Sequence, residues 1–324
     1  MINSRGVKNK NLNKKLKIPL ILVTGFLGSG KTTFIRHLLV RYADEHRIGI
    51  IQNEYASAHI DTAELNATGK KFSILEINNG SVFCVCLLAN FIDSLAAFID
   101  DHSPDLLILE SSGLSDPIGI AELMQHEKLV YKTFLLQSVC IIDLVNFFKV
   151  VRLSERLKRQ IMIADMILLN KSDQGHESAG PVTAHIRKLN PFAVIAETAF
   201  CRKDDFPDPF TTHRKALAVR MNYSLEPYER ADIKTVVLRT TRQFPEDLVT
   251  RFISEVEQYC IRMKGFINLD NKKMISVQSE FGKTEIREID YYAGPTELIG
   301  LGHEISQEHF GRLYHDLRKS RTEN

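Results

Sequence analysis

The chain has 324 residues, of which 44% are hydrophobic and 25% charged, and its formal net charge is +2. These values are ordinary for a soluble globular protein of about two domains, and they exclude a disordered chain, a collagen and a disulfide-stapled miniprotein. The longest strongly apolar runs, about ten residues, are too short to span a bilayer, and the small net charge is not typical of a nucleic-acid binder.

Basic residues gather at the N-terminus, where residues 1–17 hold six lysines and arginines and no acid. We interpret residues 1–16 as a flexible basic tail. The alternative is that this tail binds a partner protein or RNA. The apolar run after the tail leads into a glycine loop, so no signal peptide is expected. The odd number of cysteines, five, fits free thiols in a reducing compartment, and we therefore expect a cytoplasmic protein.

Short apolar runs alternate with helix-like stretches from residue 17 to residue 200. The runs are rich in Ile, Leu and Val, as in strands that are buried on both faces of a parallel sheet. They are Pro19–Gly25, Ile48–Asn53, Phe72–Ile77, Asp105–Glu110, Val139–Asp143, Met166–Asn170 and Ala193–Ala196. The predicted helices are Thr32–Glu45, Ala89–Asp101, Pro117–Glu127, Ser154–Ala164 and Pro181–Leu189. This alternation predicts an α/β domain with a mainly parallel sheet over residues 17–200.

The pattern changes after residue 200. Residues 201–232 are charged and contain proline, so we interpret them as a linker. Residues 233–324 are predicted to form a smaller α+β domain, because strands there follow one another directly. Its expected elements are strands Ile233–Thr240, Gly265–Leu269, Met274–Gln278, Thr284–Ile289 and Thr296–Gly302 and helices Pro245–Met263 and Gln307–Lys319.

A phosphate-binding loop lies near the start of the first domain. Residues 25–32, Gly-Phe-Leu-Gly-Ser-Gly-Lys-Thr, match the P-loop pattern between an apolar strand and an amphipathic helix. We expect the loop and its helix, from Gly28, Ser29 and Gly30 through Thr33, to hold the phosphates with backbone N–H groups and the helix N-terminus. Lys31 is predicted to neutralise the β- and γ-phosphates in catalysis, and Thr32 to bind Mg²⁺. The glycine spacing does not fit a dinucleotide-binding fingerprint.

Two further strand ends carry polar groups that suit a nucleotide site. Glu110 ends an apolar strand, where a carboxylate can hold Mg²⁺ directly or through water, although an acid that caps the following helix is the alternative. Asn170, Lys171 and Asp173 form N-K-x-D after another apolar strand. Asp173 can accept both hydrogen bonds from guanine, whereas adenine lacks that donor pair. Asn170 is expected to support the loop and Lys171 to cover the base, so GTP is the predicted nucleotide.

Cys84 and Cys86 are close enough in sequence to act together on one soft or borderline cation, such as Zn²⁺, Co²⁺ or Ni²⁺. Glu54, His59 and Asp61 are further candidate donors in the neighbouring sequence. Two packed thiols without a metal are the alternative. The remaining three cysteines are interpreted as buried small hydrophobes.

In combination these residues resemble the CobW family of P-loop GTPases, metal chaperones or insertases related to the urease and hydrogenase accessory GTPases. The resemblance covers roughly residues 17–320 and follows the family's motif order. The matching segments are 25–33, 53–55, 60–61, 79–80, 110–117, 141–143, 170–173, 262–266 and 297–302. It implies a P-loop GTPase domain followed by a CobW-type C-terminal domain, a slow Mg²⁺-dependent GTPase, and first-switch behaviour at Asn53–Glu54–Tyr55.

The chain departs from the family in its cysteine motif. The family has C-x-C-C after Asn-Gly, whereas this chain has Ser81, Val82, Phe83 and Cys84, followed by Cys86. The resemblance implies delivery of a transition metal to a client protein, with Cys84, Cys86 and Glu54 as metal ligands. Glu54 and Glu110 are also the candidates for placing the hydrolytic water. We expect a client metalloprotein as partner, leave a homodimer open, and expect neither nucleic acid nor membrane.

Two other functions remain open on the sequence. The first is a GTP-dependent factor that activates or remodels a cofactor-dependent enzyme, for example a corrinoid protein, without a metal cargo. The second is a P-loop kinase for a small molecule. N-K-x-D argues against the kinase, because such enzymes rarely need to select guanine.

Overall fold

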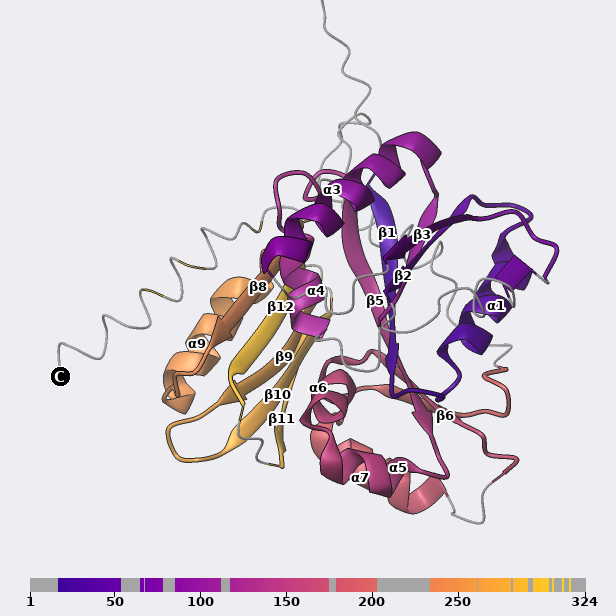
Figure 1. Ribbon diagram of the computed structural model, residues 1–324. Coiled ribbons are helices and arrows are strands. Elements are labelled where there is room, and N and C mark those ends of the chain that lie inside the picture. Colours follow the sequence, from indigo (N-terminus) through magenta and orange to yellow (C-terminus); the bar gives the residue numbers. More distant parts are fainter. Residues whose placement is uncertain are drawn as a thin grey trace, which may run out of the picture.

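The computed structural model describes most of the chain. The described residues are 17–53, 65–66, 68–77, 85–111, 117–174, 179–202, 234–260, 262–280, 282–290, 294–302, 305, 311 and 315. Among them are two sheets, one of seven strands and one of five, each with helices packed against it (Figure 1).

The seven-stranded sheet is parallel throughout, with strand order β3-β2-β4-β1-β5-β6-β7. Its strands are β1 (Ile18–Gly25), β2 (Ile48–Asn53), β3 (Ser73–Ile77), β4 (Leu106–Glu110), β5 (Thr133–Asp143), β6 (Met166–Asn170) and β7 (Val194–Glu197). All seven predicted strands are present, although β5 begins six residues earlier than expected. The central strands are apolar on both sides because helices cover both faces.

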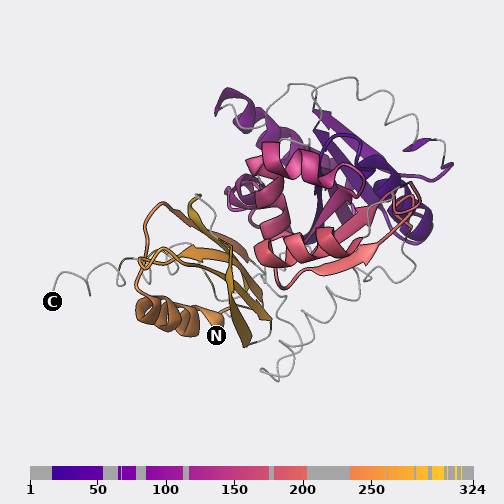
Figure 2. The same ribbon diagram turned by 90° about the horizontal axis from the view of Figure 1, so that it is seen from below.

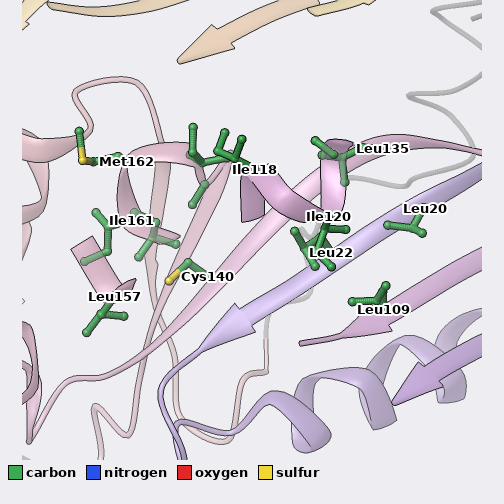
Figure 3. Close-up of a cluster of buried hydrophobic side chains, with 14 of the residues drawn as sticks. Leu20, Leu22, Leu109, Ile118, Ile120, Leu135, Cys140, Leu157, Ile161 and Met162 are labelled. Atoms are coloured by element: carbon green, nitrogen blue, oxygen red, sulfur yellow. The ribbon is translucent and has the colours of Figure 1, made fainter. Parts of the chain in front are cut away.

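Of the helices among the described residues, α1 packs on one face of this sheet and five others pack on the opposite face. Helix α1 (Lys31–Tyr42) packs through Phe34, Ile35, Leu38 and Leu39, whose spacing forms one apolar stripe. The opposite face carries α3 (Val85–His102), α4 (Pro117–Leu123), α5 (Phe147–Leu153), α6 (Glu155–Ile163) and α7 (Ala179–Leu189). In Figure 3 Leu22 of β1 lies beside Ile120 of α4, and Leu157 and Ile161 of α6 lie near Cys140 of β5.

The five-stranded sheet is antiparallel, with strand order β11-β10-β9-β12-β8. Its strands are β8 (Lys234–Thr240), β9 (Arg262–Asn268), β10 (Met274–Glu280), β11 (Lys283–Ile289) and β12 (Thr296–Gly302). Helix α9 (Glu246–Glu257) covers one face through Val249, Phe252, Ile253 and Val256. The α/β domain with a following α+β region is therefore confirmed.

The other face of the five-stranded sheet packs against the first unit, with α4 beside β8 and β12 (Figures 1 and 2). Val237, Phe266, Met274 and Ile289 belong to the same apolar core as α4 and α6. Buried charges also cross this interface. The Asp165 carboxylate at the start of β6 pairs with Arg262 and lies 3.1 Å from Lys264 Nζ, both cations from β9.

One predicted helix is too long, and one observed helix was not predicted. The helix expected over Pro245–Met263 ends at Glu257, and Met263 lies instead in β9, where it pairs with Ser279 and Gly300. Helix α5 was not predicted, because it is short and follows β5 after one turn. The expected helix Gln307–Lys319 and the linker from residue 203 onward lie almost entirely outside the described residues.

Candidate functional site

The loop between β1 and α1 has a backbone that only glycine adopts readily. Gly25, Gly28 and Gly30 have φ values of 138°, 71° and 109°, all in the positive region that L side chains disfavour. Gly30 is also the N-cap residue of α1, so the loop leads directly into the helix N-terminus. Unpaired N–H groups at such a terminus favour an anion. The predicted residues thus lie in the loop, Gly28 to Gly30, and in the first turn of α1, Lys31 to Thr33.

Gly30 lies where two distant segments meet. A Cβ on Gly30 would come within 2.5 Å of Asn170 Nδ2 and 3.0 Å of Cys201 Sγ. Asn170 Nδ2 donates a hydrogen bond to the Ser29 carbonyl at 2.8 Å, and Cys201 Sγ donates to the Gly30 carbonyl at 3.4 Å. The loop is thus attached to the ends of β6 and β7, more than 130 residues away in sequence.

Lys31 opens helix α1 and is buried. Its Nζ donates to the Phe26 carbonyl at 3.4 Å, so the ammonium group folds back over the loop that precedes it. A buried cation with a carbonyl as partner is poorly compensated, and an anionic phosphate would be a stronger partner. This geometry suits the predicted role of Lys31.

Glu110 and Thr32 lie side by side next to this loop. Thr32 Oγ1 donates to Glu110 Oε1 at 3.2 Å, and Gln52 Nε2 donates to Glu110 Oε2 at 3.2 Å. The Glu110 carboxylate is 6% exposed. A hydroxyl beside a carboxylate is the hard oxygen donor set that Mg²⁺ prefers, so these residues fit that ion. The alternative role of Glu110 as a helix cap lies outside the described residues, because residues 112–116 are not described.

Asn170 holds the N-K-x-D loop in place. Its Oδ1 accepts from the Cys201 backbone N–H at 2.8 Å, while its Nδ2 is bound to Ser29, so the buried amide joins three segments. Asp173 lies three residues later in a turn and is exposed. The expectation that Asn170 supports the loop therefore has a geometric basis, and Asp173 is accessible to a ligand.

Lys171 has a fixed partner that the sequence did not reveal. Its φ is 66°, and its Nζ pairs with Asp143 Oδ2 at 2.8 Å. Burial alone would raise the pKa of Asp143, but hydrogen bonds from Lys171 and Asn146 outweigh that effect and hold the pKa below its usual value. The ammonium group is thus held toward the end of β5.

Sequence reasoning missed three contributors to this site. Asp143 was noted only within a family motif, although its place at the carboxyl end of a strand beside β1 was a usable signal. Gln52 is a polar residue at the end of an apolar strand, which was a weaker signal. The loop 198–202 showed no signal in the sequence. In the structure it contacts Asn170 through the Cys201 backbone N–H, and the Phe200 carbonyl accepts a hydrogen bond from His37.

The predicted transition-metal ligands cannot be placed. Glu54 and Cys84 lie outside the described residues, and Cys86 is described only through the backbone of α3. Within the described part of the chain, no three His, Cys, Asp or Glu side chains are grouped to hold a metal ion. Cys140, Cys201 and Cys260 are buried as expected, and burial raises the pKa of each thiol to about 12.

Helices long and apolar enough to cross a membrane are absent from the described segments.

Curated relatives share the sequence in part. Zinc chaperone CobW from Sinorhizobium sp. is 40% identical over 106 residues, which are 31% of this chain and 29% of that protein. Zinc chaperone YeiR from Escherichia coli is 35% identical over 156 residues, 47% of this chain and 46% of that protein. The chain thus spans less than half the length of both relatives.

Among solved structures, the Zn(II)-bound YjiA GTPase from E. coli is similar to this chain. Its TM-score is 0.47 and its sequence identity 21%, and the alignment covers 94% of this chain and 100% of the YjiA chain. HypB from Helicobacter pylori in complex with nickel has a TM-score of 0.41 and 18% identity, over 67% and 93% of the two chains. The family model described as CobW/HypB/UreG, nucleotide-binding domain, matches residues 19–197, which include the loop, Glu110 and the N-K-x-D segment. With more than half of its length in that match, the chain belongs to the CobW/HypB/UreG family of nucleotide-binding proteins.

Proposed function

We propose that this protein is a GTP-hydrolysing metallochaperone that delivers a transition metal to a client protein. One observation carries the nucleotide part: the Asn170 side chain joins the phosphate loop at Ser29 to the N-K-x-D loop. A single nucleotide can therefore lie across both loops, with its phosphates at residues 25–33 and its base at Asp173.

In this proposal the residues of the site bind the phosphates, hold Mg²⁺ and place the attacking water. The amides of residues 28–33 bind the phosphates, and Lys31 neutralises charge that develops on the transferring phosphoryl group. Thr32 and Glu110 would hold Mg²⁺, which supplies Lewis-acid stabilisation of the phosphate oxygens when bound. Glu54 and Glu110 are the candidates for placing the attacking water. We expect slow turnover, because the sequence shows no recognisable arginine finger.

Guanine selection falls to Asp173, supported by Asn170 and Lys171. The carboxylate accepts from both guanine donors, and it would be left unpaired against adenine. Because Asp143 holds the Lys171 ammonium group, the lysine stem is kept in a fixed position beside the base-reading turn.

The cargo part rests on the family and on the cysteine segment. Both curated relatives described above are named zinc chaperones, so Zn²⁺ is the first metal to test, ahead of Co²⁺ and Ni²⁺. Cys84, Cys86 and Glu54 are the proposed ligands. Residues 17–200 would form the hydrolysing unit, and residues 233–324, joined by the linker 201–232, would recognise the client.

The altered cysteine motif favours one alternative. Serine and valine stand at the start of the segment in which the family resemblance implies C-x-C-C. If the segment binds no metal, the protein would be a GTP-driven activator of a cofactor-dependent enzyme, and its cysteines would be structural.

Metal titration of the reduced protein under anaerobic conditions separates these functions. Zn²⁺, Co²⁺ and Ni²⁺ are added with and without Mg²⁺ and a non-hydrolysable GTP analogue, and the Cys84→Ser/Cys86→Ser double variant is the control. Binding at one cysteine-dependent site that shifts with nucleotide would support the chaperone. Lack of such a site in both nucleotide states would overturn the cargo role. GTP and ATP turnover, measured in parallel, tests the nucleotide part independently, because equal use of both would revive the kinase.

A further inference from the structure

Gln52 occupies the position beside Glu110 on the neighbouring strand. The two residues are register partners in the parallel pair β2–β4, one residue before the end of β2 and at the end of β4. Alternate strand residues share a face, and Ile50 and Ile108 of the same pair both belong to the core under α1. The Gln52 and Glu110 side chains therefore point toward α1, where Thr32 lies.

The two oxygens of Glu110 have different partners. Oε1 accepts from Thr32 and Oε2 accepts from the Gln52 amide, each at 3.2 Å. Gln52 is 2% exposed, so the amide has little access to water. With one oxygen bound to a group on the sheet, the carboxylate keeps its other oxygen directed at the phosphate loop.

The chemistry of the donor matters as much as its position. An amide orients a carboxylate without cancelling its negative charge, whereas lysine or arginine would compete with a cation for it. Groups that orient a metal-binding carboxylate in this way typically change metal affinity by about 10- to 100-fold when they are removed. A glutamine is thus well suited to a carboxylate that must remain available to Mg²⁺.

We propose that Gln52 is a positioning residue that orients Glu110 and thereby sets the affinity of the nucleotide site for Mg²⁺. This inference rests on the proposed function, in which Thr32 and Glu110 hold that ion. Gln52 does not touch the phosphates in this proposal; it acts only through Glu110.

The test measures fluorescent GDP binding across a Mg²⁺ series and in EDTA. Gln52→Met keeps the shape and removes the donor. We expect the Mg²⁺ concentration for half-maximal enhancement of GDP affinity to rise about tenfold or more, with affinity in EDTA unchanged. The matched control is Gln160→Met, a buried glutamine on α6, which should leave the Mg²⁺ midpoint unchanged. If Gln52→Met does not fold, Gln52→Asn takes its place, because its side chain is one methylene shorter and withdraws the amide from Glu110.

A double-mutant cycle with Glu110→Gln separates the inference from the function beneath it. Glu110→Gln should shift the Mg²⁺ midpoint, and Gln52→Met should add nothing in that background. A midpoint that Gln52→Met leaves within about twofold of wild type, while Glu110→Gln shifts it, would overturn the inference alone. A midpoint that does not respond to Glu110→Gln would overturn the Mg²⁺ role of Glu110 and the inference together.

Discussion

Replacement of Gly30 by alanine would test how the loop between β1 and α1 is attached to the N-K-x-D loop. The new methyl group would lie 2.5 Å from Asn170 Nδ2, well inside contact distance, at a φ of 109°. Asn170 would have to leave Ser29, with which it shares a hydrogen bond of 2.8 Å. Backbone strain of about 1–2 kcal/mol adds to about 1–3 kcal/mol for a buried amide that loses its partner. We expect unfolding to become easier by about 2–5 kcal/mol.

Gly28→Ala is a matched control, because Gly28 also has a positive φ, 71°, yet a Cβ there meets nothing within 4 Å. It should show only the strain of about 1–2 kcal/mol. Thermal unfolding would place Gly30→Ala about 5–15 °C below wild type, and a fluorescent GDP titration should show affinity lower by about tenfold or more. Equal losses of melting temperature in the two variants would refute the reasoning.

Three further substitutions test the charged groups. Asp143→Asn should destabilise the fold at neutral pH but not in acid. The pKa of Asp143 is lower in the folded state than in the unfolded state. The stabilisation by its carboxylate is therefore complete above the unfolded-state pKa and is lost as the pH falls through the folded-state pKa. Denaturant titrations between pH 3 and 7 measure this difference. Asp173→Ala should reduce the preference for GTP over ATP, measured by competition binding, by about a hundredfold. Asp165→Asn should lower the unfolding free energy by about 3–5 kcal/mol, because the buried Lys264 and the partly buried Arg262 lose their counter-ion.

Each of these three predictions has a result that would contradict it. A loss in Asp143→Asn that stays constant down to pH 3 would mean that its carboxylate charge is not the cause. Unchanged nucleotide preference in Asp173→Ala would remove that residue from base selection. For Asp165→Asn the control is Asp290→Asn at an exposed ion pair with Lys188, where a loss below about 1 kcal/mol is expected; equal losses would contradict the role of burial.

Local sequence signals predicted much of this molecule. The seven apolar runs match the seven strands. The central strands β1, β4, β5 and β6 were the clearest, because a strand covered on both faces must be apolar throughout. The phosphate loop and N-K-x-D were found because their chemistry requires fixed residue types at short spacing.

Long-range contacts explain what was missed. Helical spacing of apolar residues continues past Val256 to Cys260 and Met263, so the pattern alone extends α9; sheet pairing of Met263 with Gly300 ends it. The partners of Asp143 and Gln52 lie 28 and 58 residues away. Only the folded sheet brings such pairs together, which is why the sequence named Glu110 but not the amide beside it.

The buried charges between the two sheets have a consequence for modularity. A chimera that joins the nucleotide-binding half of this chain to the C-terminal half of a relative would inherit Asp165 without a guarantee of Arg262 and Lys264. It would also have to match the apolar surface around Val237 and Phe266. Substitutions on the two sides of this interface are therefore expected to have accumulated together. A functional exchange of the C-terminal half would also have to exchange the residues of the first half that contact it.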